Sequence, residues 1–340
     1  MPPGYPQGRW LRAGRLGQAW LVRTPHPWAL PTQPVSRRLL AAAGVSDEMI
    51  DTQLAAGRLV RLRRGVFVAS AAWPDGAADR HVMLAHAEQV INPDAVLSHG
   101  TAAVIWGLPA PSFQPWHESP VAATYPAGGR YSSRGGTAVR HTRPLPTSEV
   151  TRDPDGYAVT TVARTAVDLA LDRPLPDRLV ILDGAARTIL ASFVGAPRRR
   201  DFLNPRLVSA TREALATVAP ARATRSLAPV IALVEPARES AAESLTAAHI
   251  HLAGLPTPLF QAAIVTRLGT LYPDFFWEDA RLIGECDGAI KYTEPNAYVR
   301  EKEREQVLRD DDYRFVRWLG KEIMLHPLEV VARIERALAT

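Results

Sequence analysis

Cysteine, lysine and long apolar runs are scarce in this sequence. A single cysteine, Cys286, excludes a disulfide framework and any zinc site built from several thiolates. No apolar run reaches the roughly 18 residues that a helix needs to span a bilayer, and no basic-then-apolar signal opens the chain. These absences predict a protein of the reducing cytoplasm that makes no membrane contact.

Acidic residues are absent before Asp47, and the whole chain has three lysines, so arginine carries nearly all of the positive charge. The formal net charge is +5. An arginine-rich chain that is also rich in alanine and proline first reflects a habit of composition, and only second the binding of nucleic acid. We interpret residues 1–34 as a disordered tail, with an organelle transit peptide as the alternative.

The length of 340 residues, with 46% apolar and 22% charged side chains, predicts two or three domains with a sizeable core. We therefore expect an α/β multidomain protein that is divided at proline- and glycine-rich breaks. The expected segments are the tail (1–34), a compact unit of helices and a hairpin (35–76), a mixed α/β region (77–195), a helical connector (196–237) and a C-terminal unit (238–340).

The first compact unit has the order helix, turn, helix, ribbon. Ser36 and Ser46 each precede an apolar run at helical spacing, which is typical of N-caps, and Gly57 ends the second helix. The stretch RLVRLRRGVFV then alternates apolar and basic residues like a two-stranded ribbon. This order predicts a winged helix-turn-helix.

The positive charge of this unit lies on the ribbon and not on the second helix. That helix carries Asp47, Glu48 and Asp51, whose carboxylates would repel DNA phosphates, so ordinary insertion into the major groove is disfavoured. We expect the ribbon to contact double-stranded DNA by clamping phosphate or entering a minor groove; a solvated strand face is the alternative. The candidate DNA-binding residues are Arg58, Arg61, Arg63 and Arg64.

In the middle region, the sequence predicts helices over 78–91 and 98–106, strands in VAATYP and TAVRHT, and a helix capped by Thr161. The C-terminal unit reads as a helix (239–252), three strands (LFQAAIVT, LYPDFFW and RLIGECD), a polar helix (297–310), a strand (YRFVRWL) and a last helix (327–338). The histidines show no spacing that brings two or three together on one helix face, and we interpret all of them as structural.

Carboxylates gather on consecutive predicted strands of the C-terminal unit. Side chains alternate along a strand, so Glu285 and Asp287 share a face, and Asp274 joins them if the hairpin pairs in ordinary register. Such close like charges repel unless a divalent cation or a shared proton compensates, and hard oxygen ligands suit magnesium or manganese. Glu243 adds a fourth candidate carboxylate, and Lys291 a cation for developing phosphate charge. The alternatives are solvent-facing strand carboxylates and a tight turn after Asp287.

The stretch PDFFWEDARLIGECDGAIKY resembles the PD-(D/E)XK nuclease superfamily, in particular its very-short-patch-repair-like branch, and the resemblance covers about 238–338. It implies a restriction-endonuclease-like fold of order α-β-β-β-α-β, a catalytic set of Asp274, Glu285, Asp287 and Lys291, and a magnesium or manganese ion on Asp274, Glu285 and Glu243. The sequence departs from the family pattern at Asp287, where the pattern has lysine, and Lys291 is a candidate substitute.

The N-terminal half resembles a second family. VSRRLLAAAGVSDEMIDTQLAAGRLVRLRRGVFV is similar to the winged-helix domain of AbiE-type (type IV) antitoxins. LSHGTAAVIWGL and YAVTTVARTAVDLAL are similar to segments of the region that follows that domain. The resemblance implies binding to DNA, often at the protein's own promoter, and a cognate toxin as a partner.

Three functions are open at this point. The first is a DNA-binding transcriptional regulator of the antitoxin kind, possessing a nuclease-like C-terminal unit and acting as a monomer or a homodimer. The second is a magnesium-dependent DNA endonuclease guided by its winged-helix head, in phage defence or repair. The third is an interaction module that has lost both roles. The intact carboxylates favour the enzyme, the absence of lysine at 287 disfavours it, and the acidic second helix disfavours a simple repressor.

Overall fold

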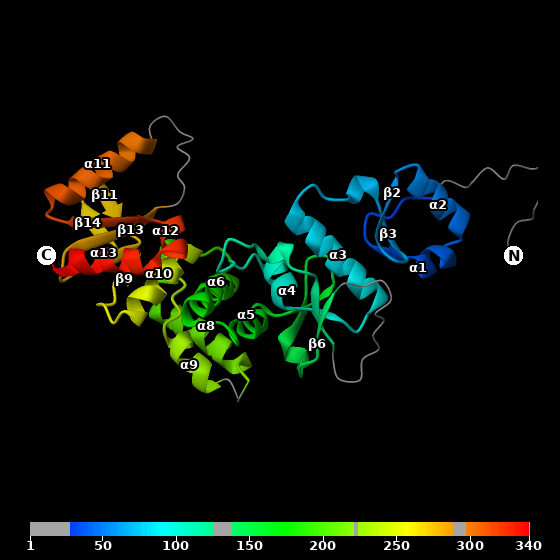
Figure 1. Ribbon diagram of the computed structural model, residues 1–340, viewed down its shortest axis with the longest axis horizontal. Helices are drawn as coiled ribbons and strands as arrows, with labels where there is room; N and C mark the ends of the chain where they lie inside the picture. The colour runs from blue at the N-terminus through cyan, green and yellow to red at the C-terminus, as the bar shows by residue number, and fades with distance from the viewer. Residues whose placement is uncertain (1–27, 126–137, 221–223, 288–296, 340) are drawn as a thin grey trace, which may run out of the picture.

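The computed structural model describes residues 28–125, 138–220, 224–287 and 297–339. Along the molecule lie a small head, a middle unit with a five-stranded sheet, a bundle of helices and a C-terminal unit with a four-stranded sheet (Figure 1). In the described part of the chain, no helix is both long and apolar enough to cross a membrane. Most of the predicted tail lies outside the described residues.

The head contains the predicted pair of helices and the predicted ribbon. Its elements are β1 (Val35–Ser36), α1 (Arg37–Ala42), α2 (Asp47–Ala55), β2 (Leu59–Arg63) and β3 (Val66–Ala69). Both predicted caps are confirmed, since the hydroxyls of Ser36 and Ser46 accept hydrogen bonds from the amides of Leu39 and Met49, each at 3.2 Å. The short strand β1, which the sequence did not indicate, completes a sheet of order β1-β3-β2.

The middle unit is a five-stranded mixed sheet of order β6-β5-β4-β8-β7. Its strands are β4 (Val96–Leu97), β5 (Ala122–Thr124), β6 (Val139–His141), β7 (Val150–Arg152) and β8 (Ala158–Thr160), and its helices are α3 (Ala77–Ile91), α4 (His99–Trp106) and α5 (Val162–Ala170). The predicted cap of α5 is confirmed, because the Thr161 hydroxyl accepts from the Arg164 amide. Helix α3 also packs against the strands of the head.

A bundle of helices follows: α6 (Leu175–Val194), α7 (Arg199–Phe202), α8 (Pro205–Val218) and α9 (Thr224–Ala232). The long helix α6 was not predicted, and it contains Gly184, a residue that ordinarily weakens a helix. A Cβ atom at Gly184 would lie 2.3 Å from Cδ of Pro109, so the glycine lets the loop after α4 approach the helix closely. The cost of the glycine is offset by this packing.

The C-terminal unit has a four-stranded sheet of order β14-β13-β12-β9 and a separate hairpin of β10 and β11. Its elements are α10 (Ala241–Leu252), β9 (Leu259–Phe260), β10 (Ile264–Thr266), β11 (Gly269–Leu271), β12 (Phe275–Trp277), β13 (Leu282–Asp287), α11 (Ala297–Asp310), β14 (Arg314–Leu319), α12 (Gly320–Leu325) and α13 (Pro327–Ala339). Two predicted strands are therefore each divided in two. Gln261, at a φ of 51°, turns the chain after β9, and Pro273 precedes β12.

Helices cover both faces of this sheet (Figure 1). Phe275, Cys286 and Trp318 face α10, where the Trp318 indole donates to the Thr246 hydroxyl at 3.0 Å. Ile283 lies on the opposite face, in a cluster with Leu308 of α11. Because side chains alternate along β13, Glu285 and Asp287 lie on the same face as Ile283.

The segment expected to be a connector is part of a shared core. One cluster of buried side chains runs from α5 and α6 through α8 and α9 to α10 and the C-terminal sheet. Arg238 also donates to Asp183 of α6 at 2.7 Å, with both side chains almost fully buried. The structure thus differs from the expected break at 196–237, because residues on both sides of it pack together.

Candidate functional site

The acidic site, defined as Asp274, Glu285 and Asp287, lies where β12 and β13 pair. The predicted ordinary register is confirmed: Phe275 pairs with Gly284, which places Asp274 beside Glu285. The Asp274 carboxylate accepts hydrogen bonds from the Cys286 amide at 3.0 Å and from the Gln261 side-chain amide at 3.1 Å. Two donors thus orient Asp274 toward the neighbouring strand.

Electrostatics within the acidic site are unfavourable in the absence of a cation. Burial, followed by the charge of Asp274, raises the pKa of Glu285 to about 8. Burial likewise raises the pKa of Asp274. Among the described residues, no hydrogen bond reaches the Glu285 carboxyl group. Glu285 is therefore a half-buried acid that favours either a proton or an added positive charge.

Glu243, the fourth expected carboxylate, lies in the first turn of the helix α10, whose N-cap is Ser240. Its two oxygens accept hydrogen bonds from the Ser240 hydroxyl and the Glu239 amide, both at 2.8 Å. Burial, followed by the charge of Asp274, raises the pKa of Glu243 to about 7. Glu243 thus lies within electrostatic range of Asp274, but its oxygens are occupied and its helix covers the opposite face of the sheet from Glu285.

The expected metal site depends on the type and the number of the donor atoms that its residues offer. Asp274 and Glu285 offer hard carboxylate oxygens, which fit magnesium or manganese. Within the described residues, however, no three side chains of His, Cys, Asp and Glu are grouped so that they could hold a metal ion. Lys291 lies in 288–296, outside the described residues. The pair Asp274 and Glu285 is therefore the part of the expected ligand set that the described residues bring together.

A cation that the sequence did not indicate stands beside the acidic site. Strand β14 runs parallel to β13 and pairs Arg317 with Glu285. One guanidinium nitrogen of Arg317 lies 3.6 Å from Asp287 Oδ2 and the other lies 3.2 Å from Glu305 Oε2. The pairing joins strands separated by a helix, so it could not be inferred from the spacing of residues along the chain.

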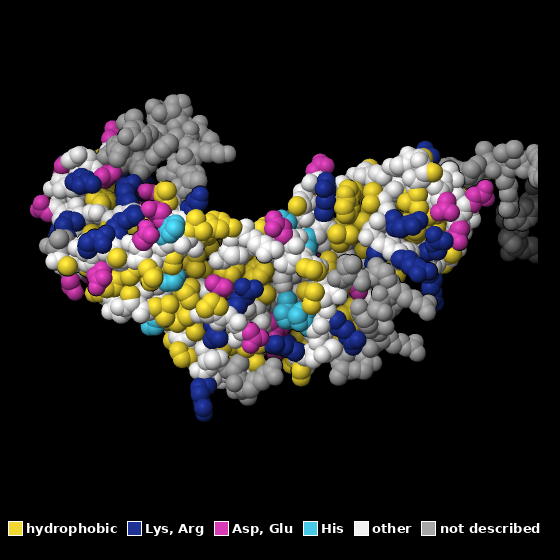
Figure 2. Space-filling view, in the orientation of Figure 1, with side chains coloured by type: hydrophobic (Ala, Val, Ile, Leu, Met, Phe, Trp, Pro, Cys, Tyr) yellow, Lys and Arg dark blue, Asp and Glu magenta, His cyan; other side chains and the backbone are white. Residues whose placement is uncertain are grey.

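The candidate DNA-binding arginines of the head separate into two kinds. Arg58, Arg61 and Arg64 are exposed, and Figure 2 shows basic side chains gathered over the head and over the C-terminal unit. Arg63 is different: its side chain is 7% exposed and forms an ion pair with the buried Glu88 of α3. The assignment of Arg63 to DNA binding is therefore corrected, because its guanidinium fastens the ribbon to α3.

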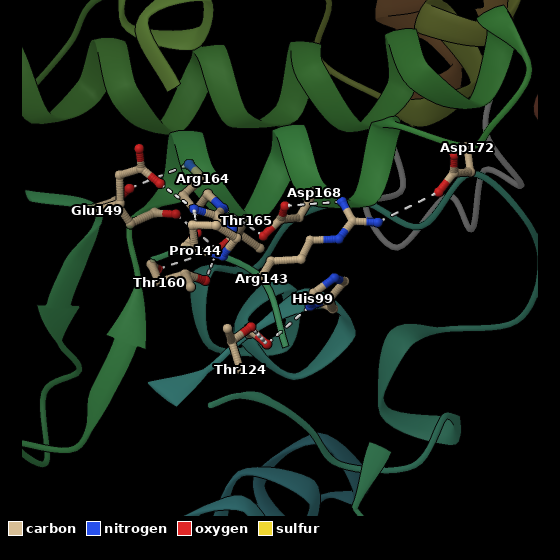
Figure 3. Close-up of polar contacts among 12 residues, drawn as sticks. His99, Thr124, Arg143, Pro144, Glu149, Thr160, Arg164, Thr165, Asp168 and Asp172 are labelled. Carbon is tan, nitrogen blue, oxygen red and sulfur yellow. Dashed lines mark hydrogen bonds and ion pairs between the residues drawn. The ribbon is translucent and has the colours of Figure 1, made fainter. Parts of the chain in front are cut away.

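A second polar cluster lies in the middle unit, between α4, α5 and the end of β6 (Figure 3). His99 begins α4 with a φ of 51°, a strained value for a non-glycine residue. Its ring stacks on His141 with centroids 3.4 Å apart, and its Nδ1 lies 3.0 Å from the Ser98 hydroxyl. Arg143 approaches Asp168 of α5 at 3.7 Å, and Arg164 donates to the same carboxylate at 2.7 Å.

This cluster holds His99 in its neutral form. Burial first, and then the nearby His141 and Arg143, lower the pKa of His99 to about 3. The sequence offered His99 no partner beyond Ser98, and the fold supplies His141. The signal that was present is the resemblance of LSHGTAAVIWGL and VARTAVDLAL to antitoxin segments, which contain His99 and Asp168. Backbone strain with a perturbed pKa marks the cluster as a second candidate site.

Comparison of the chain with protein-family models and with curated proteins found no match.

Proposed function

We propose that the protein binds double-stranded DNA and hydrolyses a phosphodiester bond at its acidic site with magnesium or manganese. The observation that carries the proposal is the position of Asp274, just before β12, next to Glu285 of β13. Glu285 is a half-buried carboxyl group that accepts no hydrogen bond among the described residues. The resemblance of PDFFWEDARLIGECDGAIKY to PD-(D/E)XK nucleases supports the same chemistry. A restriction-endonuclease-like fold is proposed with it.

Asp274 and Glu285 are the residues that would hold the ion. A bound ion would polarise the scissile phosphate and lower the pKa of the attacking water. The chain itself orients Asp274 through Gln261 and the Cys286 amide. In the hydrolysis, the water oxygen bonds to phosphorus and the bond from phosphorus to a sugar oxygen breaks. That oxygen takes one proton of the water and leaves as a hydroxyl, and the product phosphate carries the other.

The head is proposed to be a winged helix-turn-helix that contacts the DNA backbone with its ribbon. Arg58, Arg61 and Arg64 are exposed along the hairpin of β2 and β3, and such side chains supply the salt-dependent part of DNA affinity. The acidic residues of α2 support contact through the ribbon over insertion of that helix. The head and the acidic site lie toward opposite ends of the molecule (Figure 1).

Nicking of supercoiled plasmid by the full-length protein with Mn²⁺ tests the nuclease proposal. Asp274→Asn and Glu285→Gln should each abolish nicking while leaving duplex binding by the head unchanged. Asp279→Asn, an exposed carboxylate in the turn between the same two strands, is the matched control and should nick as the wild type does. Wild-type nicking rates in the first two variants would overturn the proposal.

A DNA-binding transcriptional regulator of the type IV antitoxin kind is the second candidate. It is favoured by a basic surface on the head that is separate from the acidic site. A cognate toxin and a second copy of the chain are the proposed partners in that case. Specific duplex binding without nicking in either Mg²⁺ or Mn²⁺ would support this function over the first.

A further inference from the structure

The acidic site needs a positive charge if a DNA phosphate is to enter it. When ionised, Asp274, Glu285 and Asp287 repel a phosphate, and a divalent ion held by Asp274 and Glu285 would offset only part of that charge. Nucleases of the resembled family use a lysine at the position of Asp287, so the charge at that position is reversed in this chain. A replacement must lie on the same face of the sheet and within reach of Glu285.

Arg317 meets both conditions. Residues paired across parallel strands project to the same face, so the pairing of Glu285 with Arg317 places their side chains together. The neighbouring pair, Cys286 and Trp318, projects to the opposite face, toward α10. Arg317 also lies within 3.6 Å of Asp287, so its guanidinium is at the acidic site and not merely on the same strand.

We propose that Arg317 is the cationic catalytic residue of the acidic site, and that its guanidinium contacts a nonbridging oxygen of the scissile phosphate. The inference rests on the nuclease function proposed above. A guanidinium has five N–H donors in a fixed fork, which allows it to keep a carboxylate contact while it binds a phosphate oxygen. Asp287 and Glu305 then act as positioning residues, because they hold the guanidinium from two sides.

Three other arginines of the C-terminal unit form their contacts elsewhere, whereas Arg304 of α11 lies near enough to Glu285 for its charge to lower the pKa of that carboxyl group. Arg314, on the same strand, donates to the backbone carbonyls of Ala280 and Ala337. Arg333 of α13 pairs with Glu322. Arg309 pairs with Glu305, as Arg317 does, but from the next turn of α11 and with an exposed side chain. Arg309 is therefore the matched control, since its loss removes one charge and one contact to Glu305.

The first test measures nicking of supercoiled plasmid by full-length variants at saturating DNA in Mn²⁺. Arg317→Met should reduce the cleavage rate on the order of 100-fold, as the loss of one charge-stabilising donor does in other enzymes. Arg317→Lys should restore part of the rate because it returns the charge without the fork. Arg309→Met should cleave as the wild type does, and DNA affinity, which the head supplies, should change little in all three.

The second test measures Mn²⁺ binding by calorimetry without DNA. The affinity for Mn²⁺ should rise in the variant whose cleavage rate falls. Removal of a positive charge beside the acidic site should make Arg317→Met bind Mn²⁺ more tightly than the wild type, while Arg317→Lys and Arg309→Met should not. A purely structural role for Arg317 would weaken metal binding and cleavage together. The opposite signs of the two effects separate electrostatics from loss of structure.

Each result decides between the proposals. Wild-type cleavage by Arg317→Met overturns the role of Arg317 and leaves the nuclease function standing. Tighter Mn²⁺ binding by Arg317→Met in a protein that does not nick places Arg317 at the site but overturns the nuclease function. A wild type that neither nicks nor binds Mn²⁺ overturns both. If Arg317→Met fails to fold, Arg317→Lys carries the test, and cleavage by it at or below the rate of an Asp274→Asn control overturns the role of Arg317.

Discussion

Glu285 and His99 both have strongly shifted pKa values, and they respond to pH in opposite senses. Glu285 holds a proton that an exposed glutamate would release, because burial and Asp274 disfavour its charge. His99 stays neutral at a pH where an exposed histidine would be protonated, because burial and its neighbours His141 and Arg143 disfavour the charged imidazole. Each residue therefore makes folding stability depend on pH over a window of its own.

For Glu285, the folded chain binds more protons than the unfolded chain between about pH 4.5 and 8, so folding stability should fall as pH rises through this window. Glu285→Gln removes this titration, and the decline should become shallower by up to about 1.4 kcal/mol per pH unit. Urea unfolding across the window, with a chelator present, measures it. Asp279→Asn should decline as the wild type does, and a parallel curve for Glu285→Gln would contradict the assignment.

For His99, the unfolded chain binds more protons than the folded chain between about pH 3 and 6.5, so stability should fall as pH drops through this window. His99→Asn should flatten the acid side of the stability profile, and asparagine tolerates the left-handed backbone at this position. Thermal unfolding in acidic buffers measures the change. An unaltered acid limb in the variant would show that His99 does not titrate as its burial requires.

At the scale of elements, local signals in the sequence predicted several of the helices and the ribbon of the head but not the packing between elements. Ser36, Ser46 and Thr161 predicted three helix starts because N-caps act within one turn. The burial of Arg63 depends on where α3 packs, and the position of Arg317 depends on a parallel pairing across α11. Neither of these long-range contacts produces a periodic pattern in the sequence from which it could be predicted.

The carboxylates illustrate the same division. Alternation and hairpin register placed Asp274 beside Glu285 correctly, since both are properties of one local hairpin. The hydrogen bonds of Glu243 at the start of α10 were missed, although Ser240 precedes it by three residues, the spacing of an N-cap serine and a glutamate in the first turn. The helix α6 was also missed; its interior glycine, Gly184, is explained only by the close approach of Pro109.

The ribbon of the head supplies a prediction about DNA affinity. Replacement of Arg58, Arg61 and Arg64 by alanine should weaken duplex binding irrespective of sequence and reduce the salt slope by about 0.9 per lost phosphate contact. Arg63→Ala should leave the salt slope unchanged and instead lower stability, by about 3–5 kcal/mol, since it leaves Glu88 buried with its charge uncompensated. Binding isotherms at several salt concentrations, with melting curves, separate the two effects.

At the scale of the whole molecule, the bundle and the C-terminal unit share one core, so they should unfold together. A fragment of residues 238–340 would expose the side of α10 that packs on α6, and it would leave Arg238 without Asp183. We expect this fragment to lack a cooperative thermal transition, whereas a fragment that begins at 161, and so keeps α5, should keep one. Circular dichroism of both fragments decides the matter, and a cooperative transition in the shorter one would restore the boundary expected from the sequence.

The ion pair of Arg63 with Glu88 has a geometric consequence. It joins the ribbon to α3, α3 packs on the middle sheet, and the middle unit shares a core of buried side chains with the C-terminal sheet. If the ribbon binds DNA and the acidic site cleaves it, as proposed above, continuous packing connects the two sites. Any strand break should fall at a constant number of base pairs from the footprint of the head, and loosening the Arg63 fastening should broaden that spacing.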